Sequence, residues 1–224
     1  MLFNARIYHY GFLLAFPAAM LLVLAVLDWI PGAIARRGGS HEIFRGAALG
    51  SIWVVVALHL WLTASWFGQK THPLGAGPDF SWGDSRAVPV AHVLEAIQSR
   101  SSPHSTLAVI PDGEMLNFLA RRPNSQRYSM LNPTEIVAFG ESEIVESYRA
   151  HPPDWIALVH KDTSEFGWRF FGRDYARSLA SWIADNYRGV ETFGARPFTS
   201  KEFGVTLLVR NGSETAESSS NFTR

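Results

Sequence analysis

The architecture of this chain is decided by residues 46–67, which read GAALGSIWVVVALHLWLTASWF and contain no charged side chain. At a rise of about 1.5 Å per residue, roughly 20 apolar residues cross the hydrocarbon core of a bilayer, so this run is long enough to span one. A second uncharged run extends from Gly11 to Leu27, with aromatic residues at both ends. We therefore predict that residues 1–67 form a hairpin of two transmembrane helices, about 9–30 and 46–67, anchored in a lipid bilayer.

The charges beside the two runs predict an orientation. Residues 31–45, between the runs, carry three arginines, whereas the outer flanks carry only Arg6 and Lys70 nearby. Positively charged loops stay in the cytoplasm, so we expect a multi-pass protein of the cytoplasmic membrane with its soluble domain outside the cytoplasm. The alternative is a signal peptide with Ala33-Ile34-Ala35 as its cleavage site, which leaves the second run as the anchor.

Composition excludes several classes of function. The 20 basic and 20 acidic residues balance, and the basic residues form no stripe among aromatic ones, which argues against nucleic-acid binding. The chain has no cysteine, which excludes disulfides, thiolate zinc sites and a cysteine nucleophile. The histidines lack metal-ligand spacing and no G-x-S-x-G motif occurs, so we predict no metal, no cofactor and no serine nucleophile elbow.

The part after the second run has the pattern of one folded domain. Residues 68–84 are rich in glycine and proline and are interpreted as a linker, and residues 211–224 as a disordered tail. Between them, residues 85–210 alternate predicted helices with short runs of strand type. The helices are expected from Pro89 onward and at 114–121, 141–150 and 175–187, and the strands at 105–110, 155–159, 190–193 and 204–209.

This alternation predicts a soluble α/β domain, with an open sheet and helices packed on it. The last two strands are close in the chain and favour an antiparallel pair, so the sheet is expected to be mixed. Ligands of open α/β sheets bind at strand ends and the adjoining loops. The candidate substrate-binding residues at such positions are Asp112, Glu114, Tyr128, Asn132 and Lys161. No complete catalytic site is visible, and no catalytic residue is assigned.

Three features have competing interpretations. Asp112, in the turn after the strand 105–110, is expected to N-cap the next helix; the alternatives are an anion site and an acid–base pair with Glu114. His59 lies inside the second run, where an ionisable group suggests function, but packing among tryptophans is favoured. The aromatic residues of 166–172 either stack on a sugar, enter the membrane interface or close the core.

Several segments carry a resemblance to a known class of enzymes. They are Tyr8-His9-Tyr10-Gly11-Phe12 before Pro17-Ala18-Ala19, Ala108 to Asn117 (AVIPDGEMLN), Pro153 to Val159 (PDWIALV), Gly172-Arg173-Asp174-Tyr175 and Phe203-Gly204-Val205. In this order they resemble the last membrane helices and extracytoplasmic C-terminal domain of polytopic glycosyltransferases that use a polyprenyl-phosphate sugar. The families are the dolichyl-phosphate-mannose–protein mannosyltransferase-like and aminoarabinose-transferase-like transferases.

The resemblance implies a membrane-anchored C-terminal or accessory module of such a transferase. The catalytic acid of the family lies in its first extracytoplasmic loop, whereas the loop here is short, offers Glu42 alone and is predicted to be cytoplasmic. The resemblance therefore implies a module without catalysis of its own, with a larger multispan transferase chain or a polyprenyl-phosphate lipid as partner. The alternative is an envelope protein-interaction or structural module anchored by the hairpin.

Overall fold

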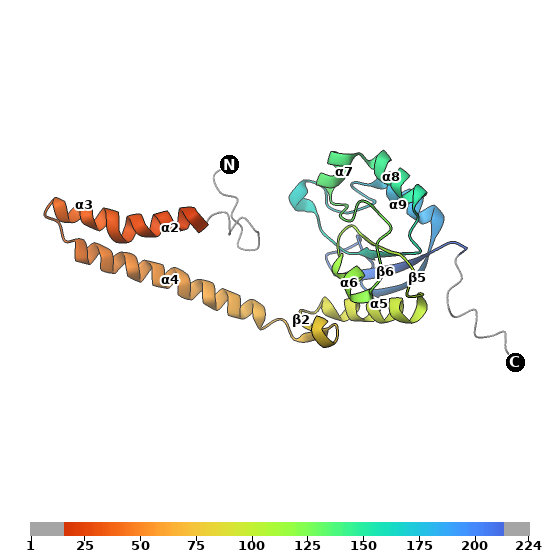
Figure 1. The fold of residues 1–224 in the computed structure, drawn as a ribbon, viewed down its shortest axis with the longest axis horizontal. Coiled ribbons are helices and arrows are strands. Elements are labelled where there is room, and N and C mark those ends of the chain that lie inside the picture. The colour runs from red at the N-terminus through yellow and green to blue at the C-terminus, as the bar shows by residue number, and fades with distance from the viewer. Residues whose placement is uncertain (1–15, 213–224) are drawn as a thin grey trace. The chain divides into compact units, whose positions relative to one another are not determined.

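The computed structural model of the chain describes residues 16–212 (Figure 1). The chain divides into two units, with the boundary between Gly68 and Gln69. The predicted first span begins at residue 9, so its first residues, like most of the predicted tail, lie outside the described part.

The first unit consists of two long helices. The helix α2 (Phe16–Leu24) continues through a π-helical turn, η1 (Ala25–Trp29), into α3 (Ile30–Arg36), and the second helix is α4 (His41–Phe67). Both continuous helices, of 21 and 27 residues, are long and apolar enough to cross a membrane. The α4 helix packs along α3 and η1 and buries none of its residues in this unit.

The segment interpreted as a linker holds a short hairpin that belongs to the second unit. Strand β1 (His72–Leu74) pairs antiparallel with β2 (Ser81–Gly83), and a 3-10 turn, η2 (Gly77–Asp79), lies between them. Gly75 has a φ of +78°, and a Cβ there would lie 2.4 Å from the Asp79 carbonyl oxygen, so the turn requires glycine.

The second unit contains a four-stranded mixed sheet, as predicted. Its order is β3 (Leu107–Ile110), β4 (Trp155–Val159), β6 (Gly204–Arg210) and β5 (Tyr187–Gly194). The β3 and β4 strands are parallel, whereas β6 runs antiparallel to both β4 and β5. A bulge interrupts the pairing of β5 with β6 between Gly189 and Glu191.

Helices cover both faces of this sheet, and the alternation of strand side chains explains why. On one face, Ala108 and Ile110 of β3 pack with α8 (Glu141–Ala150) and α9 (Arg177–Asn186). On the other face, Leu107 and Val109 pack with α5 (Ala87–Arg100) and α6 (Met115–Ala120). Figure 1 shows these two helical layers on opposite sides of the strands. Two core clusters therefore share one sheet.

Two further short elements were not predicted. The helix α7 (Pro133–Phe139) begins after Asn132 with proline at its first position, and the 3-10 turn η3 (Ser164–Phe166) follows β4. The expected helix 175–187 is shorter than predicted, because α9 begins at Arg177 and Tyr187 already belongs to β5.

Candidate functional site

The parallel pair β3–β4 brings two of the predicted binding residues together. Parallel strands end at the same edge of a sheet, so the residues after Ile110 and Val159 meet there. The Lys161 Nζ donates a hydrogen bond to Asp112 Oδ2, although 49 residues separate them in the chain. Both side chains are partly exposed, so this ion pair remains accessible to a ligand.

This ion pair corrects the prediction that Asp112 caps a helix. The helix α6 begins at Met115, its N-cap position is occupied by Glu114, and no side chain there makes a capping hydrogen bond. The carboxylate of Asp112 is bonded to Lys161 instead. Glu114 is exposed, and among the described residues no hydrogen bond or ion pair joins it to Asp112, so the geometry gives the acid–base interpretation no support.

Asn132 lies beside the same strand end. The Leu131 N–H donates to the Pro111 carbonyl oxygen at 2.7 Å, which fixes this segment against the residue before Asp112. Asn132 occupies the N-cap position of α7 and is only 3% exposed. Within residues 16–212 its Oδ1 has no hydrogen-bond partner. A buried polar atom without a partner costs about 1–3 kcal/mol, so this unpaired oxygen lowers the stability of the fold.

Tyr175 contributes a second buried group of this kind. The residue is 7% exposed, and its hydroxyl has no hydrogen-bond partner in the described part of the chain. Burial raises the pKa of Tyr175 to about 12, and the nearby carboxylates of Glu135 and Asp112 act in the same direction. The Thr163 hydroxyl lies close enough to the phenol to lower this pKa, but it donates to the Trp168 and Arg169 carbonyl oxygens, and its geometry toward the phenol is not that of a hydrogen bond. The Tyr175 phenol is therefore neutral at physiological pH.

Five side chains lie at this strand end or act on a group there, and we call them the strand-end cluster: Asp112, Asn132, Glu135, Lys161 and Tyr175. They offer one ammonium group, two carboxylates, a phenol and an amide oxygen. This mixture of donors and acceptors suits a neutral ligand rich in hydroxyl groups better than a strong anion, because the two carboxylates oppose negative charge. Glu135 lies in no motif of the sequence, and Tyr175 was quoted there only within the segment Gly172–Tyr175, not as a site residue.

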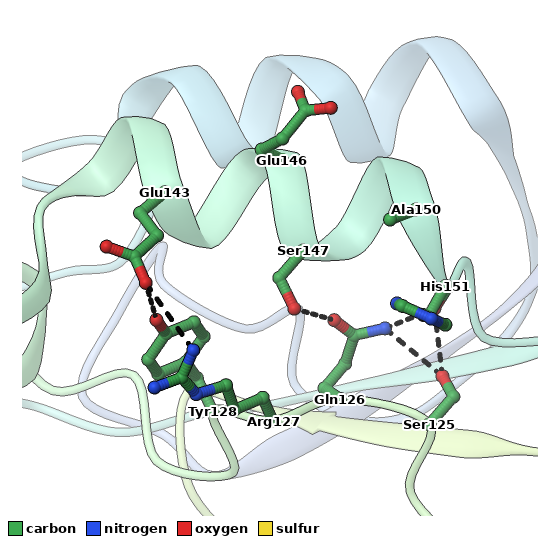
Figure 2. Close-up of a pocket in the computed structure, with 9 residues that line it drawn as sticks. All are labelled: Ser125, Gln126, Arg127, Tyr128, Glu143, Glu146, Ser147, Ala150 and His151. Carbon is green, nitrogen blue, oxygen red and sulfur yellow. Dashed lines mark hydrogen bonds and ion pairs between the residues drawn. The ribbon is translucent and has the colours of Figure 1, made fainter.

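Tyr128 lies in a different place from the cluster. Its hydroxyl donates to Glu143 of α8 at the side of a cavity of about 560 Å³ (Figure 2). Gln126 crosses the same cavity, accepting from the Ser147 hydroxyl at 3.4 Å and donating to the His151 carbonyl oxygen. These polar groups already form hydrogen bonds with one another. The cavity therefore offers a ligand fewer unpaired polar groups than the strand-end cluster does.

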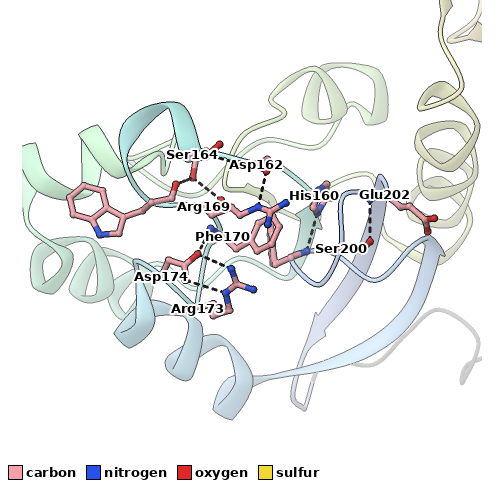
Figure 3. A network of polar contacts seen from close by, with 12 residues as sticks. His160, Asp162, Ser164, Arg169, Phe170, Arg173, Asp174, Ser200 and Glu202 are labelled. Atoms are coloured by element: carbon pink, nitrogen blue, oxygen red, sulfur yellow. Dashed lines mark hydrogen bonds and ion pairs between the residues drawn. The ribbon is translucent and has the colours of Figure 1, made fainter.

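The segment after Lys161 forms a charged network around Phe170 (Figure 3). Asp162 accepts from the Ser164 N–H at 3.0 Å and from Arg169 at 2.9 Å, and the hydrogen bonds of Ser164, with help from Arg169, lower the pKa of Asp162 to about 2. The guanidinium carbons of Arg169 and Arg173 each lie 4.6 Å from the centroid of the Phe170 ring. These contacts hold the loop beside the cluster in place.

The aromatic residues of this segment divide between core and surface. Phe170 and Phe171 are buried, which fits the interpretation that they close the core, whereas Phe166 and Trp168 are exposed. His160, at the end of β4, contacts Phe170 and accepts the Phe198 N–H on its Nδ1 at 3.0 Å. Burial lowers the pKa of His160, so its ring is neutral.

Metal binding has no candidate in the described residues, since no group of three or more histidine or acidic side chains could hold an ion. No protein-family model matches this chain. No curated protein and no solved structure matches it either. The resemblance to glycosyltransferases therefore rests on the sequence segments alone.

Proposed function

We propose that this chain is a membrane-anchored binding module. In this proposal α2–α3 and α4 cross a bilayer as a hairpin, and the α/β domain binds a ligand outside the cytoplasm. The observation that carries it is the surface of α4, a 27-residue helix with no buried residue, on which Trp53 is 68% exposed. Soluble proteins rarely expose an apolar surface of this extent, whereas a bilayer covers it.

Membrane extraction tests the anchor. The full chain should stay with the membranes in alkaline carbonate and dissolve only in detergent. Recovery of the chain in the soluble fraction without detergent contradicts the proposal. The mass of the membrane-bound chain separates an intact hairpin from cleavage after Ala35.

Orientation is testable because the chain has no cysteine. Ser40→Cys places a single thiol just before α4, and Ser178→Cys places one on the exposed side of α9. In sealed vesicles that expose the outer face, an impermeant maleimide should label the Ser178→Cys variant and leave Ser40→Cys unlabelled until detergent is added. The reverse pattern places the domain in the cytoplasm.

The ligand that we propose for the module is a sugar or its hydroxyl-bearing acceptor. We propose that the chain acts as the C-terminal or accessory module of a glycosyltransferase with a lipid-linked sugar donor, together with a larger multispan chain or polyprenyl-phosphate lipid. Two features support this: the order of the quoted sequence segments, and the unpartnered amide oxygen and phenol of the strand-end cluster. Groups of these types bind hydroxyls by hydrogen bonds without requiring charge.

A transfer assay tests this role. The tagged chain, purified in mild detergent, should bring down a multispan protein and sugar transfer from a lipid-linked donor, whereas the isolated chain should have no activity. Lys161→Ala should reduce this transfer, and Asp185→Ala, an exposed carboxylate on α9, serves as the matched control. Transfer by the isolated chain contradicts the accessory role.

A protein-interaction role is the second candidate, and α7 favours it. Val137 is 69% exposed, and Phe139 and Met130 are exposed as well, which gives this region an apolar surface of its own. The expected result is capture of an envelope protein without transferase activity, lost in the variant Val137→Lys. Capture that survives this substitution contradicts an interface at α7.

A further inference from the structure

The hairpin β1–β2 and the helix α6 expose four large apolar side chains. These are Phe80, Trp82, Met115 and Phe118, which are 47–59% exposed. These side chains do not form part of the protein core, since α6 packs against the sheet through Leu116 and Ala120 instead. Large apolar side chains that gather on one surface mark a site of interaction. We call these four residues the hairpin surface.

Contacts between the two elements join the four residues into one surface. The rings of Phe80 and Trp82 meet edge to face at 5.3 Å. Asp79, next to Phe80, forms an ion pair with Arg121, whose guanidinium carbon lies 4.3 Å from the centroid of the Phe118 ring. On α6, Met115 and Phe118 are three residues apart and share one side of the helix.

Basic residues border this surface. Met115 lines a cavity of about 300 Å³ together with Gly83, Lys70 and Arg86. Arg86 is bonded to Asp84 through three side-chain contacts, just as Arg121 is bonded to Asp79. Because these acids offset the charges of Arg86 and Arg121, the attraction of the hairpin surface to a partner is mainly apolar and aromatic.

The short connection between α4 and β1 determines which partner lies near the hairpin surface. The helix α4 ends at Phe67 and β1 begins at His72, so four residues connect them. An extended chain covers at most about 3.3–3.6 Å per residue, which keeps β1 within roughly 15–20 Å of the end of α4. If α4 spans a bilayer, this distance is two to three times the roughly 5–8 Å thickness of the headgroup region on one side, so β1 stays close to the membrane surface. The bilayer is then present at a high effective concentration.

We propose that the hairpin surface docks on the bilayer that α4 crosses, with Trp82 and Phe118 at the level of the lipid headgroups. This inference rests on the proposed membrane anchor. Tryptophan places its ring at the interface between hydrocarbon and water, and phenylalanine on an apolar interfacial face enters the boundary between headgroups and acyl chains. Long basic side chains reach back to the headgroups. Docking holds the α/β domain against the membrane. It therefore restricts the orientation of the domain, and with it that of the strand-end cluster, relative to the bilayer.

Depth-dependent quenching in the full chain tests this docking. Single cysteines replace Trp82, Phe118, Val137, Trp168 or Val54, and each carries an environment-sensitive nitrobenzoxadiazole label in phosphatidylcholine vesicles. The lipids bear a nitroxide close to the headgroup or deep in the acyl chain. Val137 is the matched control, because it is exposed and apolar but lies on α7. Circular dichroism establishes that each labelled variant is folded.

The expected result is quenching by the shallow nitroxide at positions 82 and 118 that exceeds quenching at position 137 by about twofold or more, since interfacial side chains settle at headgroup level. Position 54 should respond to the deep nitroxide. If the label at position 54 is quenched while the labels at positions 82 and 118 are quenched no more than the label at 137, the docking proposal is wrong and the membrane anchor is still supported. Loss of quenching at 54 overturns the anchor itself. Quenching at 168 in place of 82 and 118 assigns the contact to the aromatic segment and refutes the hairpin surface.

Discussion

Two buried tyrosines offer a matched test of the strand-end cluster. The hydroxyl of Tyr187 donates to the Pro153 carbonyl oxygen at 2.6 Å, whereas the hydroxyl of Tyr175 has no partner in the described residues. Both side chains belong to the same core cluster and are almost fully buried. Replacement by phenylalanine removes one oxygen atom in each case and leaves the ring in place.

The two substitutions should change stability in different directions. Tyr187→Phe loses a net hydrogen bond and leaves a carbonyl oxygen unpaired, which together should lower the free energy of unfolding by about 1–3 kcal/mol. Tyr175→Phe removes a hydroxyl that loses its hydration without a compensating hydrogen bond. Its free energy of unfolding should therefore stay within about 0.5 kcal/mol of the parent or rise by up to about 1 kcal/mol.

Urea unfolding of the full chain in detergent micelles, followed by tryptophan fluorescence, measures both effects. The midpoint should fall for Tyr187→Phe with an unchanged slope, and it should stay or rise for Tyr175→Phe. In the transfer assay, Tyr175→Phe should lower transfer more than Tyr187→Phe does, because only Tyr175 belongs to the strand-end cluster. If Tyr175→Phe destabilises as much as Tyr187→Phe does, the Tyr175 hydroxyl has a structural partner and the cluster is not open to a ligand.

Three further substitutions test the fold around the site. Gly204→Ala places a Cβ 1.9 Å from a backbone oxygen and should cost about 1–3 kcal/mol in urea unfolding, whereas Gly189→Ala meets no atom within 4 Å. Asp154→Ala removes the acceptor of the Thr106 N–H and hydroxyl, at 2.9 and 3.0 Å, and should cost about 2–3 kcal/mol in the same measurement. Folding lowers the pKa of His160 from its usual 6.5, because burial disfavours the charged ring. The contribution of the neutral ring to stability is therefore complete above about pH 6.5 and is lost as the pH falls below that value. In His160→Gln, the melting temperature should depend less on pH in this range.

Each of these predictions has an outcome that contradicts it. Equal losses in the two glycine variants exclude a steric cause at Gly204. An Asp154→Ala midpoint within error of the parent shows that the carboxylate contributes nothing to the junction of β3 and β4. If the parent and His160→Gln lose melting temperature equally between about pH 7 and pH 5, another group is responsible for the loss.

The sequence predicted the elements whose signal is local and repeated. The helix 141–150 and the strand 155–159 have the bounds that were expected, because apolar periodicity marks both and Pro152-Pro153 separates them. The antiparallel pair β5–β6 also follows from pattern and proximity in the chain. The meeting of Asp112 and Lys161 follows from the strand assignment, since both residues come directly after parallel strands.

Elements without a repeated local signal were missed. The strands of the β1–β2 hairpin have three residues each, too few for alternation to be visible, and their glycines and prolines are typical of a linker. The helix α7 has seven residues and begins with Pro133. The N-cap prediction for Asp112 was wrong because a lysine 49 residues away outcompetes the local backbone as a partner. Tyr175 and Glu135 reach the cluster by tertiary packing alone.

The bulge in β5 has a consequence for aggregation between copies of this chain. This strand forms one margin of the four-stranded sheet, where unpaired backbone groups offer a template for another chain. The irregular step at Val190, flanked by the charged side chains of Arg188 and Glu191, twists that margin and disfavours strand addition. At the opposite margin, the Leu107 N–H at the start of β3 is paired, because it donates to the Pro123 carbonyl oxygen. Strand addition between neighbouring copies is therefore disfavoured at the β5 margin.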